Sequence, residues 1–309
     1  MKKWGADIVR LWVSSQDFRN DITVSEERIG KVAEIYRMLR NALRYQLSNL
    51  YDFDPAKQAV PDEKLTGLDR WILCEFSKLE HEVARAYDAY EFHVVYQKIT
   101  QFVAVELSAI YHDVVKDRLY TDAANSARRR STQTALHRML VNLCKMLAPI
   151  LAFTADEAWE YVPGKTTASV HQLGWEPGNF QSAPQDLEDW KTLFKTRESV
   201  LAELEKARQN KLIGKALDAK VQLITHAANA LDVEKRHAEE FRELLNVSQL
   251  EFTTESASGE TTAWIPVVKK AAGQKCERCW HWETDVGSNP EHPTICARCV
   301  KAVAESTKA

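Results

Sequence analysis

The sequence predicts a mainly α protein, in which an antiparallel helical bundle is followed by a small α+β region and a cysteine-rich terminal segment. Apolar residues recur at spacings of three and four up to about residue 162, which is the period of an amphipathic helix. The chain contains only ten Gly and nine Pro, too few for the many tight turns of an all-β protein. An apolar fraction of 45% is sufficient for a core and excludes disorder along the whole chain.

The bundle is predicted to occupy residues 25–162. Its first helix begins after Ser25, a favourable N-cap, and places Glu26 and Glu27 in the first turn, where negative charge is stabilising. Three more helices each carry one apolar stripe that must be buried against the others. These stripes cover residues 68–87, 95–114 and 136–150, and residues 52–66 are predicted to be a connection.

A short helix is predicted to close the bundle. Thr154 and Glu157 have the spacing of a capping box, which predicts a helix that begins at this point and runs through Trp159. Pro and Gly then accumulate, so residues 163–186 are predicted to be a linker.

A small α+β region is predicted for residues 187–272. An amphipathic pattern predicts a helix over residues 187–207, and alternating polarity predicts a strand over residues 219–225. A further helix over residues 234–245 and short strands over residues 249–253 and 263–268 complete the region. Residues 273–302 hold the cysteine pairs, and residues 303–309 are expected to fray.

Four of the six cysteines form a pattern typical of a metal site. Cys276 and Cys279 form one C-x2-C pair, and Cys296 and Cys299 form another after sixteen intervening residues, 280–295. Two such knuckles supply four thiolates for a tetrahedral ion and leave no position for water, so we predict one structural zinc ion. A disulfide pair, a redox-active C-x2-C and an iron site remain alternatives. Cys74 and Cys144 lie in apolar stripes and are predicted to be buried.

Two groups of side chains are candidates for RNA contact. The net charge is −3, so overall charge does not indicate a nucleic-acid binder, but local basic groups occur. Arg128, Arg129 and Arg130 form the densest basic run, for which a solvated helix face is the alternative. A second group surrounds the cysteine pairs, where basic and aromatic residues could hold phosphate and stack on unpaired bases. Its candidate residues are Arg278, Trp280 and Arg298.

No self-contained active site is evident in the sequence. Neither phosphate-cradling glycine motif occurs, and no nucleophile elbow or H-E-x-x-H motif is present. We therefore expect no catalytic residues in this chain. No apolar stretch is long enough to cross a bilayer, so no membrane partner is expected, and a monomer in the cytoplasm is predicted.

Several segments resemble class I aminoacyl-tRNA synthetases. The opening GADIVRLW at residues 5–12 resembles the segment that follows their second ATP-binding signature. LDRW at residues 68–71 and MLAPILAFTADEAW at residues 146–159 resemble the start of a long helix and the end of their anticodon-binding domain. The two cysteine pairs resemble the zinc ribbon of bacterial isoleucyl-tRNA synthetases, and this ribbon distinguishes isoleucine from the valine and leucine relatives.

The resemblance implies a helical bundle of the anticodon-binding type and a function in holding tRNA(Ile). The family's catalytic and editing domains have no counterpart in this sequence, so residues 1–24 are expected to be a connector that follows a missing catalytic half. The complete enzyme would activate isoleucine with ATP and charge the tRNA, whereas this chain is expected to bind tRNA only. ATP would therefore be needed only by the complete enzyme.

Three alternatives remain at this stage. The chain could be a stand-alone RNA-binding or regulatory protein derived from such a domain. A DNA-repair glycosylase with a similar ribbon is disfavoured, because Lys2 stands where those enzymes carry the Pro nucleophile. A helical scaffold with a zinc-stapled tail would bind RNA no better than the electrostatic background.

Overall fold

The computed structural model describes residues 3–225, 233–254 and 264–306. It confirms a mainly helical chain with a small sheet region and a C-terminal cysteine cluster. The chain divides into two compact units, the first made of residues 1–113 and 127–182 and the second of residues 114–126 and 183–309. The second unit thus includes a segment, 114–126, from inside the range predicted for the bundle. No described helix is both long and apolar enough to cross a lipid bilayer.

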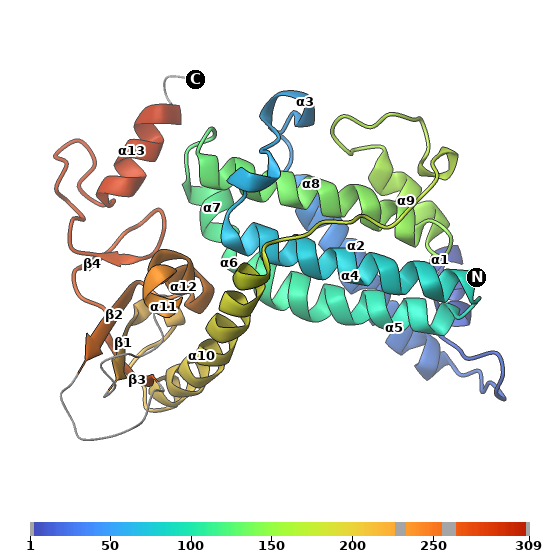
Figure 1. Ribbon diagram of the computed structural model, residues 1–309, viewed down its shortest axis with the longest axis horizontal. Helices are drawn as coiled ribbons and strands as arrows, with labels where there is room; N and C mark the ends of the chain where they lie inside the picture. The colour runs from blue at the N-terminus through green and yellow to red at the C-terminus, as the bar shows by residue number, and fades with distance from the viewer. Residues whose placement is uncertain (1–2, 226–232, 255–263, 307–309) are drawn as a thin grey trace. The chain divides into compact units, whose positions relative to one another are not determined.

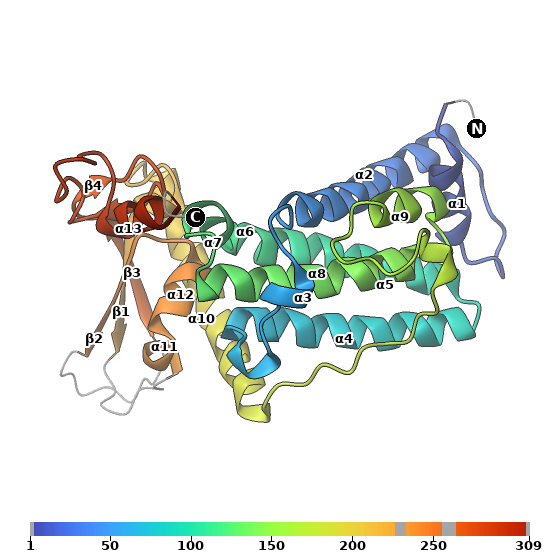
Figure 2. The same cartoon turned by 90° about the horizontal axis from the view of Figure 1, so that it is seen from above.

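The first unit is a bundle of helices (Figure 1). Helices α4, α5 and α8 lie side by side in both views (Figure 2). The Ser25 hydroxyl accepts a hydrogen bond from the Arg28 amide and caps α2, as predicted. The α-helices of this unit are α1 (Ala6–Ser14), α2 (Glu26–Ser48), α3 (Pro55–Gln58), α4 (Gly67–Asp88), α5 (Phe92–Phe102), α8 (Ala127–Leu147) and α9 (Ala152–Trp159).

The apolar stripes predicted from the sequence form the core of this bundle. Ile72 and Val83 of α4 and Leu136 and Met139 of α8 are fully buried. Cys74 and Cys144 are also buried, which confirms their predicted role as small apolar core residues. Each helix therefore contributes one face to a shared core, as its periodicity predicts.

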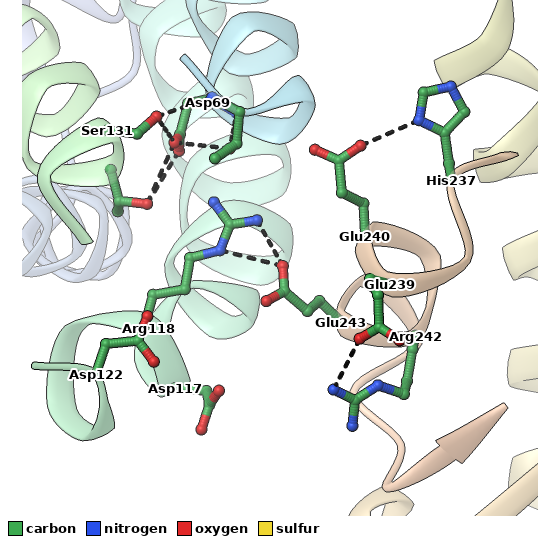
Figure 3. A network of polar contacts seen from close by, with 12 residues as sticks. Asp69, Asp117, Arg118, Asp122, Ser131, His237, Glu239, Glu240, Arg242 and Glu243 are labelled. Carbon is green, nitrogen blue, oxygen red and sulfur yellow. Dashed lines mark hydrogen bonds and ion pairs between the residues drawn. The ribbon is translucent and has the colours of Figure 1, made fainter. Parts of the chain in front are cut away.

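The third predicted helix, residues 95–114, is not a regular α-helix. It begins as α5, continues as a π-helix over Val103–Tyr111, labelled η2, and ends in α6 (His112–Val114). A π-helix carries more residues per turn, and the spacing of the apolar residues predicted a helix here without distinguishing its type. The hydroxyl of Tyr111, the last residue of the π-helix, donates to the buried Asp69 carboxylate at 2.6 Å. Ser131 donates to the same carboxylate at 2.5 Å (Figure 3).

The predicted capping box at Thr154 is wrong. Helix α9 begins two residues earlier, at Ala152, so Thr154 lies in its first turn. Its amide and its hydroxyl both donate to the Asp7 carboxylate, at 2.7 and 2.6 Å. The carboxylate that satisfies this helix N-terminus thus comes from α1, 147 positions away, and not from Glu157 in the same helix.

The second unit contains a three-stranded sheet in the order β2-β1-β3. β1 (Ala219–Thr225) confirms the predicted strand, and its residues alternate between buried and half-buried. It pairs parallel with β2 (Gln249–Thr254) and antiparallel with β3 (Ile265–Lys270). The parallel pair requires a crossover, which α11 (Val233–Arg236) and α12 (Ala238–Leu245) supply.

The rest of this unit consists of helices and the ribbon strands. Helix α10 (Pro184–Gln209) contains the predicted helix 187–207, and α7 (Lys116–Thr121) lies in segment 114–126. The ribbon consists of β4 (Gln274–Lys275), antiparallel to β5 (Trp282–Glu283), and α13 (Ala297–Ser306). Helix α13 continues through residues 303–306 of the tail 303–309 that was predicted to fray, and residues 307–309 lie outside the described residues.

The helix predicted over residues 234–245 is interrupted at His237. The His237 ring lies 3.2 Å from the carboxylate of Asp189, which belongs to α10. It lies 3.1 Å from the carboxylate of Glu240, which belongs to α12 (Figure 3). The predicted strand 263–268 is found as β3 from Ile265 onward, and residue 263 lies outside the described residues.

Candidate functional site

The four predicted metal ligands meet at one point in the ribbon. The first knuckle is the turn between β4 and β5, where the Trp280 amide donates to the Cys276 carbonyl at 2.9 Å. The second knuckle leads into α13. The four Sγ atoms of Cys276, Cys279, Cys296 and Cys299 all lie within 4.8 Å of one another, and all four residues are buried. The spacing of the two pairs therefore predicted the cluster correctly.

The geometry of the cluster fits zinc. With Zn–S bonds of about 2.3 Å, two sulfurs of a tetrahedral site are about 3.8 Å apart. The Cys279 and Cys296 sulfurs are 3.8 Å apart. All four donors are cysteine sulfurs, which is the donor set of a closed structural site. The chain thus has one structural zinc site, formed by the four cysteines.

Apart from the metal site, the ribbon has only a small apolar core to stabilise it. The four cysteines form their own buried cluster, against which only two partly buried hydrophobic residues of the described chain pack, Val286 and Ile295. Such a small apolar core cannot offset the conformational entropy that some thirty residues lose on folding. The metal therefore supplies folding free energy to this part of the chain.

The electrostatics of the cluster favour one thiolate before any cation binds. A hydrogen bond from Cys299, together with the nearby Arg298 guanidinium, lowers the pKa of Cys279 to about 4. Burial and the negative charge on Cys279 raise the pKa of Cys296 to about 11. A divalent cation would supply the charge that the remaining thiols need in order to ionise.

Arg278 and Arg298, predicted as RNA contacts, both bind segment 114–126 of the same unit. Arg298 donates to the Asp117 carboxylate at 2.5 and 2.8 Å. Arg278 donates to the Thr121 carbonyl and also approaches the Cys299 sulfur at 3.7 Å. Desolvation opposes the charged form of Asp117, but the Arg298 guanidinium overcomes it and holds the pKa of that carboxyl well below its usual range. Asp117 had no sequence signal, because its partner lies 181 positions away.

Trp280 is exposed and stands next to a basic groove. Its side chain is 58% exposed, and its backbone has φ 64°, a left-handed conformation that costs a bulky residue about 1–3 kcal/mol. The Lys215 ammonium lies 5.8 Å from the centre of the indole ring, within cation–π range. A large exposed aromatic residue thus occupies a position where glycine would be unstrained, which indicates a role for the side chain.

The neighbouring groove has a volume of about 580 Å³. Its basic residues come from the end of α10 and from β3, and the Trp282 indole forms part of its wall while donating to Asp218 at 3.1 Å. Within the described chain, no carboxylate lies within ion-pair distance of Lys211 or Lys270. We define the aromatic–basic groove as Arg208, Lys211, Lys215, Lys270, Trp280 and Trp282.

The run Arg128–Arg130 lies at the start of α8, and two of its members are buried. Arg129 donates to the two carboxylate oxygens of Asp52 at 2.6 and 2.9 Å. Arg130 donates to the Asp52 carbonyl at 3.0 Å and to the Gln133 side chain at 2.6 Å. Arg128 is half-buried and has contacts of its own. The guanidinium groups of Arg129 and Arg130 are therefore engaged inside the fold.

Comparison with known proteins gives one family match that begins in the helical part of the chain and another over the ribbon. Residues 69–223 match the family model described as the anticodon-binding domain of tRNA ligase, and residues 273–302 match the zinc finger found in FPG and IleRS. The chain is similar to the isoleucine–tRNA ligase of Syntrophotalea carbinolica, with 42% identity over 99% of this chain and 33% of that protein. It is also similar to the isoleucine–tRNA ligase of Desulfitobacterium hafniense, with 43% identity over 98% of this chain and 34% of that protein. The isoleucine–tRNA ligase of Pectobacterium carotovorum is 40% identical over 98% of this chain and 33% of that protein. The chain spans about a third of the length of these relatives.

Proposed function

We propose a function from the premise that this chain belongs to the anticodon-binding domain family of tRNA ligases: it binds tRNA(Ile) as the C-terminal part of an isoleucine–tRNA ligase. The complete enzyme would activate isoleucine with ATP and transfer it to the tRNA in the cytoplasm. The residues of this chain would contribute recognition of the tRNA and none of the catalytic groups.

The observation that carries the proposal is the aromatic–basic groove of the second unit. Lys211 and Lys270, which have no carboxylate within ion-pair distance among the described residues, are available to phosphates, and the exposed Trp280 indole offers a face on which an unpaired base can stack. Unpaired loop bases are the part of an RNA whose edges and faces a protein can reach. The groove therefore has the chemistry required by a single-stranded loop such as an anticodon loop.

Among the residues predicted from the sequence, we retain Trp280 as an RNA contact. Arg129 and Arg130 are left out because their side chains are buried against Asp52. Arg278 and Arg298 are left out because they bind segment 114–126. Lys211 and Lys215 take their place. Both belong to a basic stretch of the sequence that consists of Lys206, Arg208, Lys211, Lys215 and Lys220.

The test is a titration of the chain with tRNA that carries the isoleucine anticodon and with an unrelated tRNA, at two salt concentrations. Because phosphate contacts alone give salt-sensitive binding to any RNA, only a preference that persists at the higher salt supports the proposal. If the chain binds the two tRNAs equally well and this binding is lost at the higher salt concentration, the proposal is contradicted.

Variants of the groove add a second comparison. Trp280→Ala is expected to weaken binding about five- to hundredfold, the range for loss of one stacked base, whereas Trp280→Phe should retain most of the affinity. Lys215→Gln is expected to reduce the salt dependence, and Lys206→Gln is the matched control, because Lys206 lies in the same basic stretch but is paired with Glu203 at 2.6 Å.

A further inference from the structure

We propose that the metal-loaded ribbon clasps segment 114–126, so that zinc binding and docking of this segment are thermodynamically coupled. The proposal concerns the second unit alone and does not depend on tRNA binding. In this proposal, Arg278 and Arg298 of the two knuckles hold in place a part of the chain that is distant in sequence. It also makes Asp117 a positioning residue for the metal site.

The contacts come from both knuckles and meet on one helical turn. Each knuckle has the sequence Cys-x-Arg-Cys, so Arg278 and Arg298 occupy the same position in the two loops. Arg298 binds the Asp117 carboxylate through two hydrogen bonds and lies 3.6 Å from Asp122. Arg278 donates to the Thr121 carbonyl in the same turn of chain. The two loops therefore bind α7 as a matched pair of donors.

A third group from the ribbon reaches the same carboxylate. The Nε2 atom of His281 lies 3.8 Å from the Asp117 carboxylate. The Thr121 hydroxyl donates to that carboxylate at 2.8 Å and orients it from within α7. Asp117 is thus contacted by one residue of each loop, Arg298 directly before Cys299 and His281 two positions after Cys279.

The metal is what fixes the distance between the two arginines. The knuckles are separated by sixteen residues, 280–295, and apart from the cysteines only Val286 and Ile295 of the described chain support their packing. A tetrahedral ion bound to both loops sets their spacing and orientation at once. Two hydrogen bonds also join the loops, from the Glu277 amide to the Thr294 carbonyl at 3.1 Å and from the Cys296 amide to the Cys276 sulfur at 3.4 Å. Without the ion, the register of Arg278 and Arg298 would depend on such contacts and on this small apolar core.

The charges favour the same coupling. Four thiolates and one divalent cation leave a net negative charge, which the two guanidinium groups offset while they bind α7. Arg278 lies 3.7 Å from the Cys299 sulfur, so its guanidinium contacts the metal cluster and segment 114–126 together. Coupling of two equilibria is reciprocal: if zinc favours docking, docking must raise the affinity for zinc by the same factor.

An independent contact attaches the same segment to another element. Arg118 is fully buried and donates to the Glu243 carboxylate of α12 at 2.5 and 3.1 Å (Figure 3). This contact involves no ribbon residue. It predicts that removal of zinc loosens α7 on the side of Asp117 and Thr121 without releasing the whole segment.

The first test is hydrogen exchange on the full chain, with zinc bound and after chelation. The proposal predicts that amides of residues 117–122 lose protection together with those of the ribbon, while amides of β1 keep theirs. Unchanged exchange over residues 117–122 after zinc has been removed would overturn the proposal.

The second test is zinc affinity, measured by competition with a chromophoric chelator. Asp117 is distant in sequence from all four metal ligands. Asp117→Asn is nevertheless expected to lower zinc affinity about 10–100-fold, the usual effect of losing a residue that supports the ligands without binding the metal. Asp62→Asn is the matched control, because it removes an aspartate that pairs with Arg138 at 2.6 Å in the other unit. Equal zinc affinity of Asp117→Asn and wild type would refute the coupling, and the exchange experiment decides the question should that variant fold poorly.

Discussion

Replacement of Asp52 by alanine is expected to destabilise the helical unit by about 3 kcal/mol. The Asp52 carboxylate accepts two hydrogen bonds from Arg129, whose side chain is only 4% exposed, and a third from Gln133 at 2.8 Å. Removal of one partner of a buried ion pair costs about 3–5 kcal/mol, because the other charge stays buried. Asp52 itself is 23% exposed, so water compensates part of the loss and the lower end of the range applies.

The effect should depend on pH in a defined direction. Burial would raise the pKa of Asp52, but hydrogen bonds from Arg129 and Gln133 and the nearby guanidinium charges hold it below its ordinary value. A carboxyl group with a lowered pKa in the folded state stabilises fully above its unfolded pKa of about 3.9, and this contribution is lost as pH falls through the folded value. The difference between wild type and Asp52→Ala should therefore be constant near neutral pH and shrink below about pH 4.

Urea unfolding followed by far-UV circular dichroism measures this difference, provided that the transition of the helical unit is resolved. Glu157→Ala is the matched control, because Glu157 forms a two-bond pair with Arg40 on the surface and should contribute less than about 1 kcal/mol. The reasoning would be refuted if Asp52→Ala lowered the free energy of unfolding as little as the control does and Arg129→Gln weakened tRNA binding. Arg129 would then be an RNA contact, as the sequence predicted.

Three further predictions concern other parts of the chain. Cys279→Ser should abolish stoichiometric zinc binding, measured by metal analysis, while the helical signal of the first unit persists, because that unit has its own core. Leu136→Ala should cost about 2–5 kcal/mol in urea unfolding, since Leu136 is fully buried in α8; a value below 1 kcal/mol would contradict the assigned core. Asp7→Ala should cost about 1–2 kcal/mol, because the Thr154 amide at the N-terminus of α9 loses its acceptor, and Asp17→Ala on the exposed loop is its control.

The parts of the fold that depend on local periodicity could be predicted from the sequence. Helices α2, α4, α8 and α10 and strand β1 follow from the spacing of their apolar residues, and the cap at Ser25 follows from one side chain. The metal cluster was predictable for the same reason, because the geometry of a C-x2-C turn is local. The spacing of four cysteines in two short pairs was therefore sufficient to predict the ligands of the site.

The features that were missed depend on partners far away in the sequence. Arg129 belongs to a run that resembles a solvated basic face, and only the position of Asp52, 77 residues earlier, shows that it is buried. The carboxylate at the start of α9 comes from Asp7, 147 positions from Thr154, so the local capping signal at Glu157 was misleading. The π-helix over Val103–Tyr111 carries apolar residues at spacings that resemble those of an α-helix, so a regular α-helix was predicted there.

The attachment of α7 to the ribbon has a consequence for synthesis of the chain on the ribosome. Asp117 and Arg298 are 181 positions apart, and translation at about 5–20 residues per second needs about 10–35 s to cover that separation. During that interval segment 114–126 has been made but its binding surface does not yet exist. Because the chain passes from the first unit into the second at residue 114 and returns at residue 127, the second unit can be completed only after the last cysteine has been synthesised. Folding of the second unit is thus a late event, which the supply of metal can limit.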